Sequence, residues 1–214
     1  MHQRSLLGIG DPAVDRSVPI ERIELDDRAW IEVGRGWLRG ADSLLDALIE
    51  TVEWNQGRRW MYDRMVDDPR LSRWYRRGDS LPDPALDDVG RELHARYRVP
   101  LGGPGLNYYR DGRDSVAFHR DRELRHLDDT LIAILTLGAE RPFLVRPRGG
   151  GNSRNLSPAS GDLLVMGGRT QRDWEHGIPK VARAGPRISA TWRWSSNRGR
   201  PEHPPRRARP HRSR

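Results

Sequence analysis

The sequence contains no cysteine, so disulfide bonds and thiolate metal sites are both excluded. Lysine is almost absent as well, because Lys180 is the only one among 38 basic residues. No apolar run approaches the roughly 20 residues that a membrane-spanning helix needs. The first residues also lack the long apolar core of a signal peptide. We therefore expect a soluble, cytoplasmic protein that has no membrane partner.

The length of 214 residues predicts one domain, although only 35% of the residues are hydrophobic. We expect an irregular leader over residues 1–20, a single domain over 21–197 and a disordered tail over 198–214. The net charge of +8 is uneven, because the tail has seven arginines and one glutamate and everything before it carries only +2. The tail is Pro- and Arg-rich without periodicity. It could attract phosphates or simply aid solubility.

Hydrophobic periodicity predicts mainly β structure with flanking helices. Residues 23–33 alternate and indicate a strand, while apolar stripes predict helices from residue 40 and over residues 84–98. Short strand-like runs separated by turn residues then follow to the end of the domain. Such a series predicts a sandwich or barrel of antiparallel sheets with the helices packed on one sheet. The runs are LNYY, SVAFH, TLIAILTLG, PFLVRP, DLLVMGG and RISATWRW.

A metal site is indicated by His119 and Asp121, which lie two residues apart at the end of an apolar run. Residues i and i+2 of a strand share a face, so both side chains could reach one ion. His176, where a strand is expected to end in a loop, supplies a third ligand. Two histidines and one carboxylate form the facial arrangement of non-haem Fe(II) oxygenases. We predict these three residues as the metal ligands and the catalytic centre.

Two arginines on one strand indicate a carboxylate site beside the metal. Arg187 and Arg193 alternate onto one face of RISATWRW and stand roughly 20 Å apart at about 3.3 Å per residue. Their long side chains could lean toward each other and leave a gap about the length of a small dicarboxylate. Guanidinium groups bind carboxylates in bidentate fashion. The arginines and the metal triad together suggest an oxygenase that consumes 2-oxoglutarate.

These motifs, in this order, resemble those of the AlkB-type Fe(II)/2-oxoglutarate dioxygenases, which oxidatively remove alkyl groups from nucleic-acid bases. The similarity runs from about residue 54 to residue 194 and is strongest in its second half. It implies a double-stranded β-helix, or jelly-roll, core and Fe(II), 2-oxoglutarate and dioxygen as cofactor and cosubstrates. The matching motifs are N-x-Y (Asn107, Tyr109), H-x-D-x-E (His119, Asp121, Glu123), His176 and R-x5-R (Arg187, Arg193).

The resemblance also implies roles for individual residues around the cosubstrate. Arg187 would pair with its distal carboxylate, and Arg193 would act nearer the metal. Asn107 and Tyr109 would hydrogen-bond the cosubstrate. Ser189 stands where many family members have asparagine, which shortens the reach of that hydrogen bond.

Residues 54–77 are predicted to form a nucleic-acid lid. Arg58 to Arg77 includes seven arginines and three aspartates, interleaved with large aromatic residues that could stack on bases. By resemblance, Arg70 and Tyr75 belong to a substrate-recognition loop, and Glu123 would face the base. The alternatives are an ordinary hairpin whose tryptophans fill the core, and a solvated carboxylate at Glu123.

We therefore predict oxidative demethylation of alkylated DNA or RNA, with lesions such as 1-methyladenine and 3-methylcytosine as substrates. The base would come from a single strand or be flipped from a duplex, and the protein would act as a monomer. One alternative is a 2-oxoglutarate-dependent hydroxylase of a protein or small molecule. Another is a nucleic-acid-binding protein whose metal fold is inert.

Overall fold

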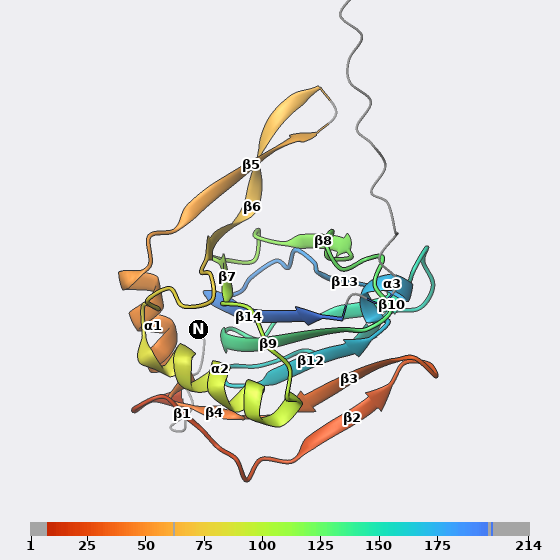
Figure 1. Ribbon diagram of the computed structural model, residues 1–214. Helices are drawn as coiled ribbons and strands as arrows, with labels where there is room; N and C mark the ends of the chain where they lie inside the picture. The colour runs from red at the N-terminus through yellow and green to blue at the C-terminus, as the bar shows by residue number, and fades with distance from the viewer. Residues whose placement is uncertain (1–7, 62, 197, 199–214) are drawn as a thin grey trace, which may run out of the picture.

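The main architectural unit is an antiparallel eight-stranded sheet. The computed structural model describes residues 8–61, 63–196 and 198, and the ribbon in Figure 1 labels their elements. The predicted tail beyond Arg198 and the first seven residues of the predicted leader lie outside these ranges. The strands of the sheet, in spatial order, are β2 (Ile20–Glu24), β3 (Ala29–Gly34), β12 (Leu163–Gly168), β9 (Thr130–Gly138), β14 (Arg187–Ser195), β7 (Gly105–Tyr109), β6 (Arg64–Trp74) and β5 (Asn55–Met61).

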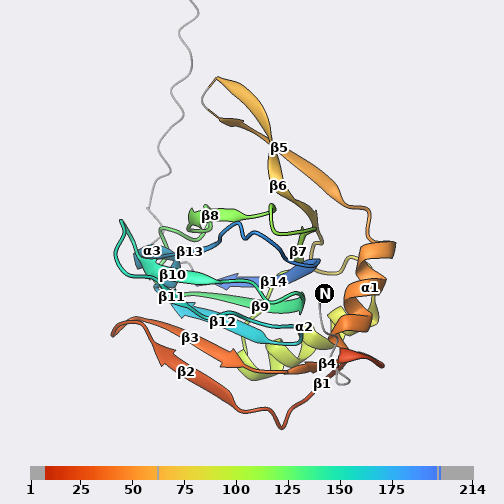
Figure 2. The same ribbon diagram turned by 180° about the vertical axis from the view of Figure 1, so that it is seen from behind.

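A smaller antiparallel sheet faces one side of the large one, as Figures 1 and 2 show from opposite directions. Its strands, in spatial order, are β11 (Arg154–Asn155), β10 (Leu144–Pro147), β13 (Trp174–Ile178) and β8 (Val116–His119). A separate pair joins β1 (Ala13–Val14) to β4 (Leu38–Arg39). The two facing sheets form the jelly-roll core, so the predicted fold class is confirmed.

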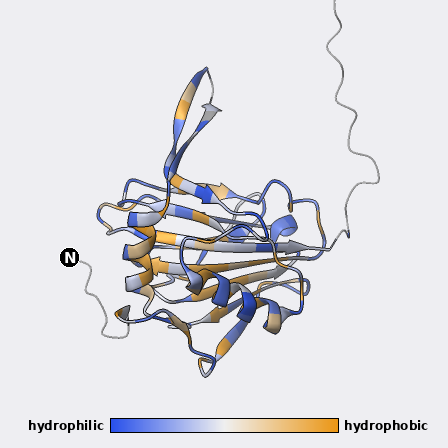
Figure 3. Ribbon diagram, turned by 60° about the vertical axis from the view of Figure 1, so that its left-hand side comes forward, coloured by the Kyte–Doolittle hydropathy of each residue, from blue (hydrophilic) through white to orange (hydrophobic). Residues whose placement is uncertain are grey.

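Strand β9 explains why the sheets pack as they do. All nine of its residues are buried, because both faces of the large sheet are covered. Leu131, Leu135 and Leu137 join a core cluster shared with the helices. Ile132 and Ile134 alternate to the other face and join a second cluster between the two sheets. Figure 3 shows hydrophobic stretches along the strands of the body.

Two helices, α1 (Ala41–Thr51) and α2 (Pro84–Tyr97), cover the outer face of the large sheet near the predicted positions. Helix α2 begins after Asp83, whose carboxylate accepts a hydrogen bond from the Ala85 N–H at 2.8 Å. Proline at its first position and a left-handed Arg98 at its end complete the start and stop signals. Among the described residues, no helix has the length and apolar character needed to cross a membrane.

Several predicted strand boundaries were wrong. The strand predicted over residues 23–33 is instead a hairpin of β2 and β3, because Asp26 accepts a hydrogen bond from the Arg28 N–H in a tight turn. The leader, predicted to be irregular, contains β1 and the first residue of β2. The segment around His176, predicted as a strand end, is the complete strand β13.

The segment over residues 54–77 forms the β5–β6 hairpin, which projects from the edge of the large sheet in Figure 1. Its base packs well, because Trp54 contacts the core cluster between the large sheet and the helices, called here the outer core. The Trp54 ring also lies 5.1 Å from the Tyr108 ring. Farther out, Trp60 is 67% exposed and pairs in register with Met65. The alternative in which the tryptophans of this hairpin all fill the core is therefore wrong.

Candidate active site

A cavity of about 660 Å³ lies between the two sheets. The large sheet contributes residues of β6, β7, β9 and β14, and the small sheet contributes β8 and β13. Most of the residues predicted for the site line this cavity, namely Arg70, Asn107, Tyr109, His119, Asp121, Glu123, His176, Ser189 and Arg193. Residues from distant parts of the sequence thus meet at one cavity.

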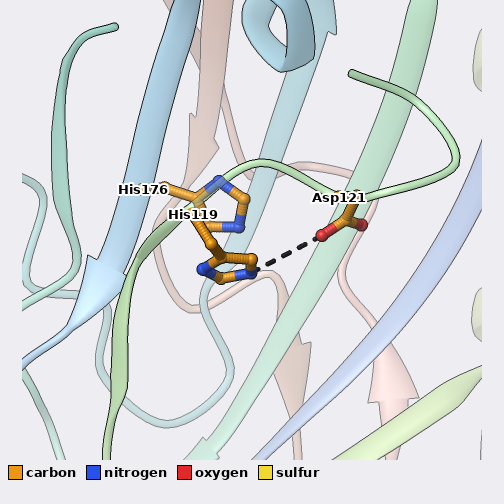
Figure 4. A group of neighbouring side chains, drawn as sticks. All are labelled: His119, Asp121 and His176. Atoms are coloured by element: carbon orange, nitrogen blue, oxygen red, sulfur yellow. Dashed lines mark ion pairs between the residues drawn. The ribbon is translucent and has the colours of Figure 1, made fainter. Parts of the chain in front are cut away.

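The predicted metal ligands come together at this cavity. His119 ends β8 and is the register partner of His176 in β13, so the two rings lie side by side with centroids 4.4 Å apart. Asp121 completes the group, and one ligand atom from each residue lies within 4.8 Å of the others. Figure 4 shows the carboxylate of Asp121 facing the His119 ring, at 3.6 Å from its Nε2 atom.

Asp121 reaches this position by a different route from the predicted one. Strand β8 stops at His119, and a turn begins at Asp121, whose carbonyl accepts hydrogen bonds from the N–H groups of Leu124 and Arg125. The expectation that His119 and Asp121 share one face of a strand was therefore wrong, because the strand ends before Asp121. Glu123 instead lies exposed in the turn, at the edge of the cavity.

The electrostatics of the site suit a divalent cation. Burial alone would raise the pKa of Asp121, but the neighbouring His119 and the positive charge of Arg193 hold that pKa well below its usual range. Arg193 donates a hydrogen bond from Nε to the Asp121 carboxylate at 2.6 Å. Burial, and then the neighbouring His119, lower the pKa of His176 to about 3. The site therefore presents one carboxylate and a neutral imidazole, the forms that bind metal.

The donor set fits Fe(II). The Nδ1 atom of His119 lies 2.9 Å from the Ala117 carbonyl, so its N–H donates there and Nε2 faces Asp121. Such a hydrogen bond fixes the tautomer of a metal-binding histidine. Phe143 stacks on His176 with ring centroids 5.6 Å apart and so limits the rotation of that ring. Two histidines and a carboxylate leave further coordination positions for other ligands.

A buried cation lies beyond the metal cluster. Arg187 is fully buried and donates hydrogen bonds to the Pro158 carbonyl, to Thr136 Oγ1 and to Ser189 Oγ. Its Nε atom has no hydrogen-bond partner in the part of the chain that the structure describes. Burial lowers its pKa to about 10, so it stays charged at neutral pH. Arg187 does not line the cavity itself but lies behind Ser189, which does.

The other predicted cosubstrate residues lie around Arg187. Asn107 and Tyr109 project from β7 into the cavity, in register with Ser189 and Arg187 of β14. Burial raises the pKa of Tyr109, which keeps its hydroxyl protonated. Arg70 donates a hydrogen bond from Nε to Asn107 Oδ1 at 2.9 Å. These contacts place the polar groups together, while their roles toward a cosubstrate stay predictions.

Trp74 is a cavity residue that belongs to the predicted lid but was not among its predicted substrate-binding residues. It lies on β6 with Arg70, is 57% exposed and carries the Arg193 guanidinium 4.8 Å from its ring centroid. Its ring covers Gly105 so closely that a Cβ there would come within 2.3 Å of it. Tyr75, one residue on, faces the opposite side and packs against the outer core. Alternation along the chain therefore turns Trp74, in place of Tyr75, toward the cavity and Arg193.

Gln171 is a second residue that no sequence motif indicated. It lies in the short helix α3 (Thr170–Asp173), and its side chain accepts a hydrogen bond from the Asp121 N–H. The two residues are 50 positions apart in the sequence. No periodicity or spacing rule could have connected them.

Comparison with known proteins agrees with this geometry. Residues 84–211 match the 2OG-Fe(II) oxygenase superfamily. A solved prolyl hydroxylase from Trichoplax adhaerens, in complex with a hypoxia inducible factor peptide, shares the fold with a TM-score of 0.57 and 12% identity over 77% of this chain and 83% of its own. The superfamily match over residues 84–211 spans more than half of the sequence and includes His119, Asp121 and His176. The chain therefore belongs to the 2OG-Fe(II) oxygenase superfamily.

Within this superfamily the chain is similar to AlkB-type dioxygenases. It is 32% identical over 177 residues to the human alpha-ketoglutarate-dependent dioxygenase alkB homolog 3, covering 73% of this chain and 62% of that protein. It is also 35% identical over 138 residues to the DNA oxidative demethylase ALKBH2 of Arabidopsis thaliana, covering 51% of this chain and 43% of that protein. This chain thus spans less than two thirds of the length of both relatives.

Proposed function

We propose that this protein is an Fe(II)- and 2-oxoglutarate-dependent dioxygenase that oxidatively demethylates alkylated bases in DNA or RNA. Repair of lesions such as 1-methyladenine and 3-methylcytosine would follow from this activity. The observation that carries the proposal is the His119–Asp121–His176 cluster in a cavity with the buried Arg187 beyond it. The names of the relatives, a dioxygenase and a DNA oxidative demethylase, support the same chemistry.

In the proposed mechanism, His119, Asp121 and His176 would hold Fe(II), which when bound would supply oxidation by dioxygen with 2-oxoglutarate as the cosubstrate that is consumed. One oxygen atom ends in succinate, and carbon dioxide is lost. The other enters the methyl group on the base, and the unstable hydroxymethyl group leaves as formaldehyde. Because the metal would carry the oxidation, the protein must hold 2-oxoglutarate, dioxygen and the base in the correct relative positions and exclude water.

The polar end of the cavity is suited to hold the cosubstrate. Arg187 carries a buried positive charge with neutral hydrogen-bond partners, and a carboxylate is the ligand that would complete it. Asn107 and Tyr109 offer further hydrogen-bonding groups on the adjacent strand. Arg193 bonds Asp121, so its role is to orient this ligand and balance its charge.

The open end of the cavity is suited to a base. Trp74 presents an indole at the rim beside Arg193, and stacking on an aromatic ring is open to every base. Arg70 and Glu123 lie at the same cavity and could contact polar edges of the base. We propose a base from a single strand or one flipped from a duplex, because the predicted metal ligands lie between two sheets. Monomeric action and a cytoplasmic location stay predictions.

Formaldehyde release tests the proposed substrate. The protein, loaded with Fe(II) and 2-oxoglutarate, would be given single-stranded oligonucleotides that carry one 1-methyladenine or 3-methylcytosine. We expect formaldehyde from both, and none from the unmethylated oligonucleotide of the same sequence. Succinate without formaldehyde on any methylated strand would contradict the nucleic-acid substrate and favour a hydroxylase of proteins or small molecules.

Trp74 should contribute to substrate binding, whereas Tyr75 should not. Base stacking on an aromatic side chain is worth about 1–3 kcal/mol, so Trp74→Ala is expected to raise the KM for the methylated oligonucleotide by about tenfold. Trp74→Phe, which keeps a ring, should recover part of this loss. Tyr75→Phe is the matched control and should leave the KM unchanged, because Tyr75 packs against the outer core. Equal effects at the two positions would rule out the stacking role.

A further inference from the structure

Helix α3 holds the segment that carries the metal-binding carboxylate. Gln171 is fully buried, and its Oε1 atom accepts a hydrogen bond from the backbone N–H of Asp121 at 2.8 Å. Asp121 lies beyond the end of β8, so no strand ladder positions its backbone. The Gln171 side chain therefore accepts the backbone hydrogen bond that a neighbouring strand would accept within a sheet.

The segment is attached to α3 at a second point. Arg120 donates a hydrogen bond from Nη1 to the Arg172 carbonyl at 3.1 Å. Helix α3 is followed directly by β13, which carries His176. One short stretch of chain thus carries one metal ligand and holds the backbone of another. The Asp121 carboxylate is fixed separately by Arg193 of β14.

Only one of the two polar atoms of the Gln171 amide, Oε1, has a hydrogen-bond partner among the described residues. Its Nε2 atom is buried without a hydrogen-bond partner among the described residues. An unpaired buried donor is unfavourable, so an apolar side chain of equal size would pack better at this position. What the amide provides and an apolar side chain cannot is the acceptor oxygen for the Asp121 N–H.

We infer that Gln171 is a positioning residue of the metal centre, acting through the backbone of Asp121. Its hydrogen bond sets the direction in which the Asp121 carboxylate leaves the turn, while Arg193 sets the orientation of the carboxylate itself. Both constraints exist before a metal binds, so the ion meets a carboxylate already in place. The inference rests on the metal site of the proposed function but not on its substrate.

Metal affinity tests the inference without any turnover. Co(II) would be titrated into the full chain without oxygen or 2-oxoglutarate, following its absorption spectrum. Loss of a partner that orients a metal ligand typically weakens binding by about 10–100-fold, so Gln171→Met should weaken Co(II) binding by about tenfold or more and alter the spectrum. Gln171→Glu keeps an acceptor oxygen and should bind Co(II) within about threefold of the unmodified protein.

Thr170→Val is the matched control. Thr170 is the preceding residue of α3, is equally buried, and its hydroxyl also has no partner in the described part of the chain. Removing that hydroxyl should leave the affinity and the spectrum unchanged. If Gln171→Met does not fold, Gln171→Asn, whose amide is too short to reach the Asp121 N–H, takes its place and carries the same expectation.

Three results would overturn the inference. These are unchanged Co(II) binding in Gln171→Met, equal losses in Gln171→Met and Gln171→Glu, and an equal loss in Thr170→Val. The last two would mean that packing in α3 matters and the acceptor oxygen does not. Absence of Co(II) binding by the unmodified protein is a different result, because it removes the metal site on which the proposed function depends.

Discussion

Replacing Asp121 with alanine is expected to lower turnover at least about 1000-fold, a loss of about 4 kcal/mol at 1.36 kcal/mol per tenfold. Asp121 is the one anionic member of the metal cluster, and it is also the partner of Arg193. Its loss leaves a positive charge beside an incomplete metal site. Formaldehyde release and Co(II) binding should fail together in this variant, while its thermal unfolding shows that the fold persists.

Asp111→Asn is the control for the Asp121 variant. Asp111 is also a carboxylate near the end of a strand, but it pairs with Arg113 in the turn after β7 and does not line the cavity. Its replacement should leave turnover unchanged. If Asp121→Ala kept normal turnover, or if Asp111→Asn lost as much, the assignment of Asp121 as a metal ligand would fail.

Loss of the Arg187 guanidinium is expected to have the next largest effect. Arg187→Met should weaken 2-oxoglutarate binding by about 100-fold, or about 2.8 kcal/mol, because hydrogen bonds to charged groups contribute about 1.5–3 kcal/mol. Arg187→Lys keeps the charge but not the planar fork, so we expect an intermediate loss of about tenfold. Isothermal titration of the Mn(II)-loaded protein with 2-oxoglutarate measures both without turnover.

Ser189→Ala separates the charge of Arg187 from its surroundings. Ser189 lines the cavity and accepts a hydrogen bond from Arg187 Nη2 at 3.4 Å. Without the Ser189 hydroxyl, Arg187 keeps its charge and its hydrogen bonds to Pro158 and Thr136, so this change should weaken cosubstrate binding by less than about tenfold. A larger loss in Ser189→Ala than in Arg187→Met would contradict the role of Arg187.

Elements with strong local signals could be predicted from the sequence. Strand β9 was recognisable because an unbroken apolar run needs cover on both faces, and α2 because Pro84 and an apolar stripe mark its start and face. The residues on β7 and β14 followed from alternation once those strands were placed. The cluster of His119, Asp121 and His176 could be predicted because these residues combine suitable chemistry with suitable order along the chain.

What could not be predicted depends on contacts between distant segments. The end of β8 at His119 is set by a turn whose Asp121 N–H is bound by Gln171, and local sequence does not encode that partner. Whether Trp74 or Tyr75 points into the cavity depends on which face of the chain turns toward it at the end of β6. That face is fixed by the register of β6 with β7, where Trp74 lies opposite Gly105. Glycine there makes room for the indole.

The most direct test of the central claim is the ratio of succinate to formaldehyde in a single reaction. The protein would be loaded with Fe(II) and 2-oxoglutarate without oxygen, then exposed to air with a single strand that carries 1-methyladenine. We expect equal amounts of both products, and neither product in the His176→Ala variant. Equal formation of both products by His176→Ala, or no succinate from unmodified protein that has bound metal, would contradict that claim.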